Sequence, residues 1–223
     1  MNTELVVLDM AGTTVADDGL VVRAFTAAVA AAGVSEEDSR YPGMLDYVVE
    51  TMGQSKITVF RALLDGDEDL ARRANSEFEN AYAKLVADGR CEPIPGAEDV
   101  IRGLRADGVK VALSTGFAPA TQRSILDALG WADLADLALA PGDGVRGRPF
   151  PDLVLAAALR LGVTDVRRIA VAGDTPSDVL SGLRSGASVV AGVLTGSGSR
   201  AELAEAGATH VLDSIRDLPS LLA

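Results

Sequence analysis

One stretch of the sequence, LVVLDMAGTT at residues 5–14, contains both a predicted strand and candidate site residues. Its first part, Leu5–Leu8, is a short continuous apolar run, which is typical of a strand buried on both faces of a parallel sheet. The next residue is Asp9, followed by small and hydroxyl-bearing residues. Because open parallel sheets bind their ligands at the carboxyl ends of strands, this junction is the first candidate for a site.

Similar apolar runs recur along the second half of the chain. Further strands are predicted at Val109–Leu113, Leu137–Ala140, Ile169–Ala172, Val189–Val193 and, more weakly, His210–Leu212. Helices are predicted between them at Ala97–Ala106, Ala118–Leu129, Pro151–Leu161, Ser177–Ser185 and Ala201–Ala206. Alternating strands and helices favour right-handed βαβ crossovers, so we expect an α/β fold with a doubly wound parallel sheet.

The interval after the first strand is predicted to be a helical insert, since no strand-like run occurs between Leu8 and Val109. Its helices are expected at Leu20–Ala32, Met44–Met52, Ile57–Leu64 and Glu68–Ala87, and each is followed by a glycine that can end it. We therefore expect a Rossmann-like core over residues 1–17 and 92–223, with an α-helical cap domain over residues 18–91.

Composition excludes several functional classes. Hydrophobic residues make up 48% of the 223 residues, which is enough for a sizeable core, and the formal net charge is -12. An acidic chain without a basic stripe argues against a nucleic-acid partner. Cys91 is the single cysteine and cannot form an internal disulfide, which favours a reducing compartment. No stretch approaches the length of a membrane span, so we expect a complete, cytoplasmic protein without a membrane partner.

Polar residues at the ends of several runs are expected to converge on one crevice. They are Asp9, then Ser114, Thr115 and Gly116, then Asp174 with Asp178, and Arg148 from a loop. Converging carboxylates repel one another, so a hard cation such as Mg²⁺ would neutralise them and leave the arginine and hydroxyls for a phosphoryl group. Taken singly, each aspartate could instead be a turn former or a helix cap.

In their order and spacing these residues resemble the haloacid dehalogenase superfamily of aspartyl-phosphate hydrolases, over essentially the whole chain. The resemblance implies that Asp9 is the nucleophile, that Thr115 binds phosphate and that Arg148 supplies the following cation. It also implies a magnesium site made by Asp9, the carbonyl of Ala11, Asp174 and Asp178. The residues expected to bind substrate are Ala11, Gly12, Thr13, Met52, Gly53, Ser114, Gly116 and Arg148.

Ala11 and Lys56 narrow the resemblance to one branch, the phosphonoacetaldehyde hydrolases or phosphonatases. The usual motif has a second aspartate at the position of Ala11, where it protonates the leaving oxygen of a phosphate ester, and its loss commonly costs about 10²–10⁴ in rate. That branch instead carries a cap lysine after a Met-Gly pair, matched here by Met52, Gly53 and Lys56. An iminium on this lysine would accept the electrons of a breaking carbon–phosphorus bond. Considered without the other motifs, Lys56 would be interpreted as an ordinary solvated lysine.

Three positions depart from the pattern of that branch. Val59 stands where the branch has a histidine, Phe117 where it has a tyrosine, and Gly19 near the place of a linker cysteine. The missing histidine would carry protons during imine formation. The chain's single histidine, His210, is expected to be an ordinary surface or edge residue.

The hypothesis drawn from these residues is a Mg²⁺-dependent hydrolase that cleaves the carbon–phosphorus bond of a small phosphonate aldehyde through an aspartyl phosphate and a Lys56 Schiff base. The alternative is a phosphomonoesterase of the same superfamily, similar to phosphoglycolate phosphatases, that acts on a small phosphorylated metabolite. A catalytically idle binding module is the third hypothesis, and the intact acidic set argues against it. The sequence is compatible with a monomer or a homodimer.

Overall fold

The computed structural model describes residues 3–142 and 144–222, and its centre is a parallel sheet in the order β3-β2-β1-β4-β5-β6. The strands are β1 (Leu5–Asp9), β2 (Lys110–Ser114), β3 (Leu137–Leu139), β4 (Ile169–Gly173), β5 (Val189–Val193) and β6 (His210–Leu212). The chain starts in the middle of the sheet and builds outward first to one side and then to the other, as a doubly wound fold requires. The predicted fold class is therefore confirmed.

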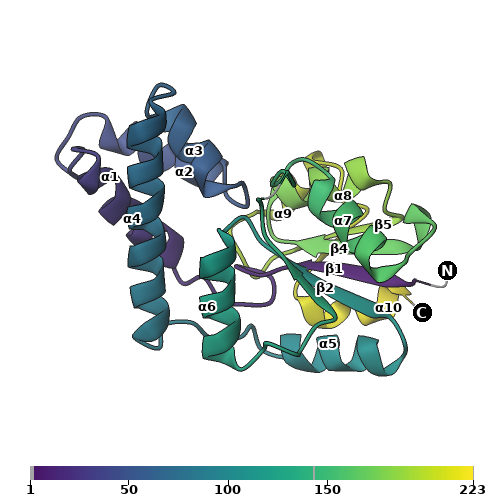
Figure 1. Ribbon diagram of the computed structural model, residues 1–223. Coiled ribbons are helices and arrows are strands. Elements are labelled where there is room, and N and C mark those ends of the chain that lie inside the picture. Colours follow the sequence, from purple (N-terminus) through teal and green to yellow (C-terminus); the bar gives the residue numbers. More distant parts are fainter. Residues whose placement is uncertain (1–2, 143, 223) are drawn as a thin grey trace.

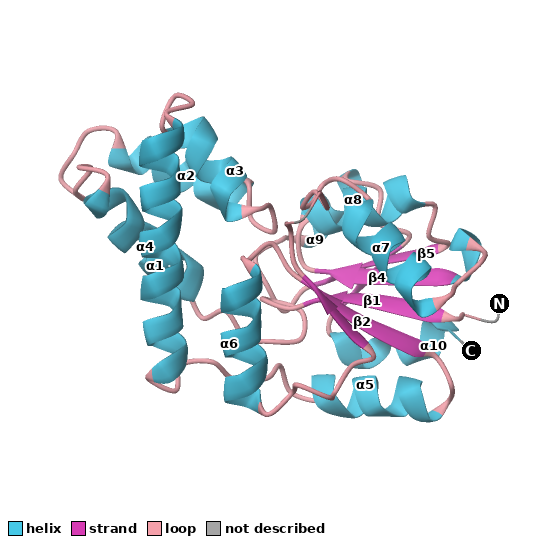
Figure 2. Cartoon of the chain, viewed as in Figure 1, coloured by secondary structure: helices cyan, strands magenta, loops and turns pink. Residues whose placement is uncertain are grey.

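Helices cover both faces of this sheet (Figure 1; Figure 2). On one side lie α7 (Asp152–Leu161), α8 (Pro176–Ser185) and α9 (Arg200–Glu205), and on the other lie α5 (Ala97–Ala106) and α10 (Pro219–Leu222). Two 3₁₀ turns, η1 (Val166–Arg168) and η2 (Ile215–Asp217), and the helix α6 (Pro119–Leu129) complete the core. In β1, Leu5 and Val7 pack with Leu153 of α7, while Val6 and Leu8 belong to the cluster that contains Ile101 of α5. This burial on both faces explains why the strand sequence lacks alternation.

Four helices lie between β1 and α5 in the chain and form a separate helical layer at the left of Figure 1. They are α1 (Leu20–Ala31), α2 (Tyr41–Glu50), α3 (Lys56–Leu63) and α4 (Glu68–Ala87). Their shared interior is aromatic: the rings of Phe25 and Phe60 stack at 6.1 Å, and Phe60 meets Phe78 edge-on at 6.1 Å.

The aromatic cluster continues into the core through Phe117, whose ring centroid lies 4.6 Å from that of Tyr82 on α4. Tyr82 is fully buried, and its hydroxyl is the one buried side-chain polar atom in the described part of the chain that has no hydrogen-bond partner. The helical layer and the sheet are therefore joined by ring packing, beside two connecting segments of backbone.

Most predicted element boundaries agree with the structure to within a residue, and the main difference is α2. The prediction placed this helix at Met44–Met52, whereas it begins at Tyr41 and ends at Glu50. Pro42 stands in its first turn, where a missing N–H costs nothing. The Met52-Gly53 pair is consequently part of a turn that leads into α3, not the end of a helix. The exact limits of the core and the cap stay a prediction. Their predicted ranges also include residues 1–2, 143 and 223, which lie outside the described part of the chain.

None of the helices among the described residues is long and apolar enough to cross a membrane.

The strand β2, which lies next to β1, offers a direct test of the core. Leu113 is completely buried between the sheet and α5–α6, so Leu113→Ala should lower the free energy of unfolding by about 2–5 kcal/mol in a denaturant titration. Leu159 on α7 is 81% exposed, and Leu159→Ala should change the free energy of unfolding by less than about 0.5 kcal/mol. Equal effects of the two substitutions would contradict this packing.

Candidate active site

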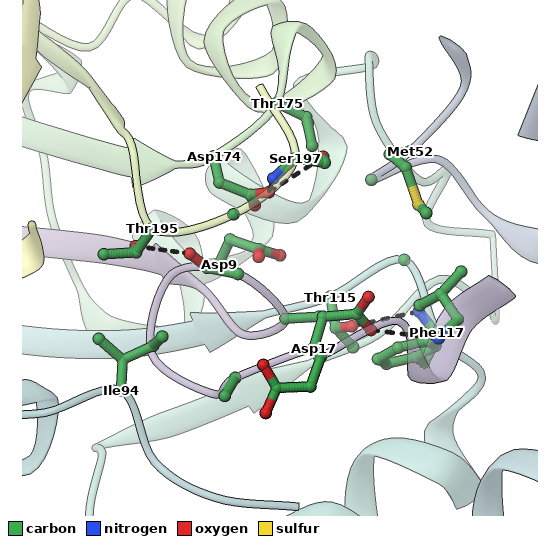
Figure 3. A pocket seen from close by; sticks show the side chains of 18 of the residues that line it. Asp9, Asp17, Met52, Ile94, Thr115, Phe117, Asp174, Thr175, Thr195 and Ser197 are labelled. Atoms are coloured by element: carbon green, nitrogen blue, oxygen red, sulfur yellow. Dashed lines mark hydrogen bonds between the residues drawn. The ribbon is translucent and has the colours of Figure 1, made fainter. Parts of the chain in front are cut away.

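The site forms where β1, β2 and β4 end side by side. Asp9 is the last residue of β1 and pairs in register with Ser114, the last residue of β2. Thr115 follows β2, and Asp174 follows β4 on the other side of β1. Parallel strands present their carboxyl ends at one edge, so the topology brings these side chains together, as Figure 3 shows for Asp9, Thr115 and Asp174.

Three buried carboxylates lie within reach of one another at this edge. Asp9, Asp174 and Asp178 each offer an oxygen, and these atoms all lie within 4.8 Å of one another. Burial raises the pKa of Asp9 well above its ordinary value, with Arg148 opposing the shift. Burial, followed by the charge of Asp178, raises the pKa of Asp174 to about 6. Cations close to these carboxylates would stabilise their ionised forms.

Arg148 is the protein's own cation at the cluster and is buried with it. Its Nη1 lies 2.6 Å from Asp9 Oδ1, its Nε lies 2.8 Å from Asp178 Oδ1, and its Nη2 donates to Ser114 Oγ at 2.8 Å. Burial alone would lower the pKa of Arg148, but the charges of Asp178 and Asp9 raise it, so the guanidinium remains charged. One arginine therefore ties together the ends of β1, β2 and α8.

Asp178 also shapes the backbone of the site. Its Oδ2 accepts hydrogen bonds from the Thr175 N–H at 3.1 Å and from the Thr175 hydroxyl at 2.5 Å, which closes a capping box at the start of α8. Asp178 is therefore a helix cap as well as a member of the acidic cluster. Both of its oxygens already have partners, whereas Arg148 is bonded to only one oxygen of Asp9.

Loop residues that the sequence analysis missed hold Asp174 in place. Its Oδ2 accepts from the Ser197 N–H at 2.8 Å and from the Ser197 hydroxyl at 3.2 Å, and Thr195 donates to the carbonyl of Gly12 at 2.7 Å (Figure 3). Gly12 has a φ of 88°, and a Cβ there would lie 2.5 Å from an Asp174 oxygen. The available signal was position, because Thr195 and Ser197 follow β5 at the same sheet edge.

A cavity of about 350 Å³ opens above the cluster and is closed on its other side by the helical layer. The predicted residues that line it are Asp9, Ala11, Gly12, Met52, Gly53, Lys56, Thr115, Gly116, Arg148 and Asp174. Three other predicted residues, Thr13, Ser114 and Asp178, are buried beside it and act through hydrogen bonds to its lining. Lining residues that were not predicted to bind are Ala16, Asp17, Asp18, Gly19, Val21, Ile94, Phe117, Thr175, Thr195, Gly196 and Ser197.

Lys56 reaches this cavity from the first turn of α3. Its Nζ lies 5.7 Å from the ring centroid of Phe117 and 5.8 Å from that of Phe78. Burial lowers the pKa of Lys56 to about 8, although the negative charges of Asp17 and Asp9 act in the opposite direction. The charge of Arg148 also lowers the pKa of Lys56, but by less than burial does. A sizeable fraction of this amine is thus neutral near pH 8.

The three departures from the phosphonatase pattern occupy different places. Phe117 and Gly19 line the cavity. Val59 is buried in the aromatic core of the helical layer and is absent from the described lining of the cavity. His210 is exposed on β6, which β4 and β5 separate from β1, so it is remote from the acidic cluster.

A parallel sheet with a buried acidic cluster and an arginine at its carboxyl edge, covered by a lysine-bearing helical layer, is the arrangement of an α/β enzyme with its active site at that edge. The model of haloacid dehalogenase-like hydrolases matches residues 3–186 of the chain. The chain therefore belongs to the haloacid dehalogenase-like hydrolase family.

Individual relatives point the same way. A phosphonoacetaldehyde hydrolase of Bordetella pertussis is 31% identical over an alignment that covers 99% of this chain and 91% of that protein. A solved phosphonoacetaldehyde hydrolase like protein from Oleispira antarctica superimposes with a TM-score of 0.84 at 26% identity, covering 100% of this chain and 92% of that one. A hydrolase from Pseudomonas syringae gives a TM-score of 0.85 at 25% identity, covering 99% and 98%.

Gly116 is the point where the loop after β2 touches the turn that precedes Lys56. A Cβ at Gly116 would lie 2.5 Å from the Gln54 carbonyl oxygen and 2.6 Å from that of Gly53. Gly116→Ala should therefore push this turn away and lower turnover of the best phosphonate or phosphate-ester substrate by about 10²-fold, because small misplacements of reacting groups are costly.

The matched control is Gly103→Ala in α5, where a Cβ meets no atom within 4 Å. It should leave turnover unchanged and stabilise the helix by up to about 1 kcal/mol. If Gly116→Ala retains wild-type turnover, the contact between loop and turn has no part in forming the site.

Proposed function

We propose that this hydrolase cleaves the carbon–phosphorus bond of a small phosphonate aldehyde, phosphonoacetaldehyde or a close relative. The observation that carries the proposal is that Lys56, an amine with a lowered pKa, lines the same cavity as Asp9 and Ala11. A carbon leaving group needs an electron sink, which an imine on Lys56 supplies, and it needs no acid at residue 11. The phosphonoacetaldehyde hydrolase relatives support this assignment.

The residues of the acidic cluster fit a divalent cation. Members of this family generally depend on Mg²⁺, which is held by hard oxygen ligands. We propose that Asp9, Asp174 and the carbonyl of Ala11 would bind it directly. Asp178 was also predicted as a ligand, but its oxygens are bonded to Arg148 and Thr175, so we assign it the orientation of Arg148 and α8. When bound, the cation would neutralise the phosphoryl oxygens.

In the proposed reaction, the free carboxylate oxygen of Asp9 attacks phosphorus in line with the bond to carbon. Arg148 and Thr115 orient the phosphoryl oxygens, and Ser114 keeps Arg148 in place through its 2.8 Å hydrogen bond. The electrons of the carbon–phosphorus bond move into the iminium on Lys56 and give an enamine. Water then hydrolyses the aspartyl phosphate and frees Asp9.

We also propose that residues 18–91 act as a cap domain on the core of residues 1–17 and 92–223. The cap reaches the core through the turn of Met52 and Gly53 and through the first residue of α3. At this point Gly53 approaches Thr175 and Gly116 closely. A site split between two parts can admit substrate when they separate and exclude water when they meet. The proposed partner is thus a small phosphonate or phosphate.

The nucleophile assignment can be tested at Asp9. Asp9→Asn should reduce phosphate release by about 10³-fold or more, because an amide does not attack phosphorus, and chelation of Mg²⁺ should abolish the wild-type rate. Phosphate release is measured alongside circular dichroism as a control for folding. A correctly folded Asp9→Asn enzyme with substantial activity would show that another residue is the nucleophile.

The imine can be tested at Lys56. Borohydride added with an aldehyde substrate should attach the carbon fragment to the peptide that contains Lys56, as seen by mass spectrometry. Lys56→Arg keeps the charge but forms no stable imine, so carbon–phosphorus cleavage should fall to background while weak ester hydrolysis survives.

If Lys56→Arg leaves turnover of the best substrate unchanged, the Schiff base is excluded. The phosphomonoesterase alternative then accounts for the site. Failure of wild-type Asp9 to form any complex with beryllofluoride, an acyl-phosphate mimic, would instead favour an idle binding module.

A further inference from the structure

Imine chemistry at Lys56 needs a proton carrier within the cavity. The amine must lose its proton before it attacks, and the hydroxyl of the carbinolamine must gain one before it leaves as water. Val59 cannot carry a proton, and His210 lies at the far edge of the sheet. Arg148 cannot serve either, because a guanidinium does not release its proton under ordinary conditions.

The carboxylates beneath Arg148 are also committed. Asp9 is paired with Arg148 at 2.6 Å, and Asp174 accepts from Ser197 at 2.8 Å. Both belong to the proposed metal site and to the step at phosphorus. The carrier at Lys56 therefore has to come from another part of the lining.

Asp17 lies in the connection between the sheet and α1 and lines the same cavity as Lys56 (Figure 3). Its side chain is half-buried, and one oxygen, Oδ1, accepts from the Val21 N–H at 3.2 Å. The Gly19 N–H also bonds to this carboxyl, and among the described residues no side-chain donor does. The carboxyl is thus held by backbone N–H groups alone and borders the cavity without a side-chain partner.

The electrostatics link Asp17 to Lys56 in both directions. Burial raises the pKa of Asp17, and the charge of Lys56 opposes that shift. Among the charges that oppose the burial of Lys56, that of Asp17 comes first, before that of Asp9. The other charged groups that act on this pair are Asp9, Asp18, Arg148 and Asp174, and the charge of Asp17 in turn acts on Tyr82, as does Cys91. Tyr82 and Cys91 have pKa values raised by burial and stay neutral at working pH.

We propose that Asp17 is the acid–base residue for Lys56, and that it supplies the proton transfers of imine formation and imine hydrolysis. The proposal rests on the proposed function, since it deepens the role of Lys56. It also locates proton transfer on the linker to α1, a different element from the one that bears the lysine.

Neutral Lys56 adds to the aldehyde carbon, and the proton of the new ammonium moves to the former carbonyl oxygen. Protonated Asp17 then donates to the resulting hydroxyl, the carbon–oxygen bond breaks, and water and an iminium form while Asp17 becomes a carboxylate. After carbon–phosphorus cleavage, the enamine carbon takes up the proton that is released when water hydrolyses the aspartyl phosphate. Asp17 then accepts a proton from the water that adds to the iminium, the carbinolamine breaks down to the aldehyde and neutral Lys56, and Asp17 is back in its starting state.

The test uses Asp17→Asn and a substrate that isolates the imine step, acetaldehyde with cyanoborohydride. Asparagine keeps an oxygen that can accept from the Val21 N–H but cannot donate a carboxylic proton. The rate of covalent labelling of Lys56 should fall by about 10²-fold, while beryllofluoride binding at Asp9 with Mg²⁺ stays at the wild-type level. The matched control is Asp18→Asn, which removes the same charge from the exposed neighbour, whose φ of 44° suits asparagine.

A purely electrostatic neighbour would behave in the opposite way. The charge of Asp17 raises the pKa of Lys56, so its removal should make the amine more often neutral and speed labelling at pH 7. The pH profile of the labelling rate is a second readout. In the wild-type protein the rate should pass a maximum and decline at high pH, because the acid loses its proton. In Asp17→Asn the rate should rise steadily as the pH passes the pKa of Lys56. Asp17→Glu should restore part of the rate.

Labelling of Asp17→Asn at or above the wild-type rate, with no change in the profile, would overturn the proposal while leaving the Schiff base intact. Absence of Lys56 labelling in the wild-type protein would overturn the Schiff base first, and this inference with it. If Asp17→Asn does not fold, a wild-type labelling rate that keeps rising with pH, without a descending limb, would overturn the proposal on its own.

Discussion

The contact on which the site depends is the buried pairing of Arg148 with Asp9 and Asp178, at 2.6 Å and 2.8 Å. Three carboxylates are gathered at one sheet edge, and this guanidinium is the cation that the chain itself places among them. Breaking such a buried pair by removing one partner commonly costs about 3–5 kcal/mol, because the other charge is left without compensation. Arg148 also bonds to Ser114, so the same side chain links the nucleophile, the phosphate-binding loop and the start of α8.

The sheet topology explains why residues far apart in sequence can share that contact. Asp9 ends the central strand, with β2 and β4 as its neighbours, and both neighbours end at the same level. Whatever follows these strands must lie at the edge where Asp9 stands. The helical layer is inserted after β1, directly beside this edge, so its first connecting segment and its Met52–Lys56 turn need only short paths to the cavity.

The sequence allowed a large part of this architecture to be predicted, for physical reasons that differ between elements. Strands such as Val189–Val193 are continuous apolar runs, and this pattern follows from burial on both faces. Helix ends were marked by glycines, but the start of α2 was missed because Pro42 suggests a break where it actually opens a helix.

Within the site, residues at strand ends could be located, since position alone brings them together. Asp17 could not, because it lies in the connection to α1 and not at a strand end, whereas Ser197 follows β5 and was missed because its bond to Asp174 forms only in three dimensions. The closeness of Lys56 to Phe78 and Phe117 was beyond prediction for the same reason, as it depends on how the helical layer sits on the core.

The buried hydroxyl of Tyr82 adds a cost to the packing of the helical layer against the core. A buried polar group without a partner costs about 1–3 kcal/mol relative to the same group in water, and this one lies where α4 packs against Phe117. The tight junction between the two parts therefore carries a built-in desolvation penalty. In the cap opening proposed above, hydration of that single oxygen would return this free energy and so favour the release of product.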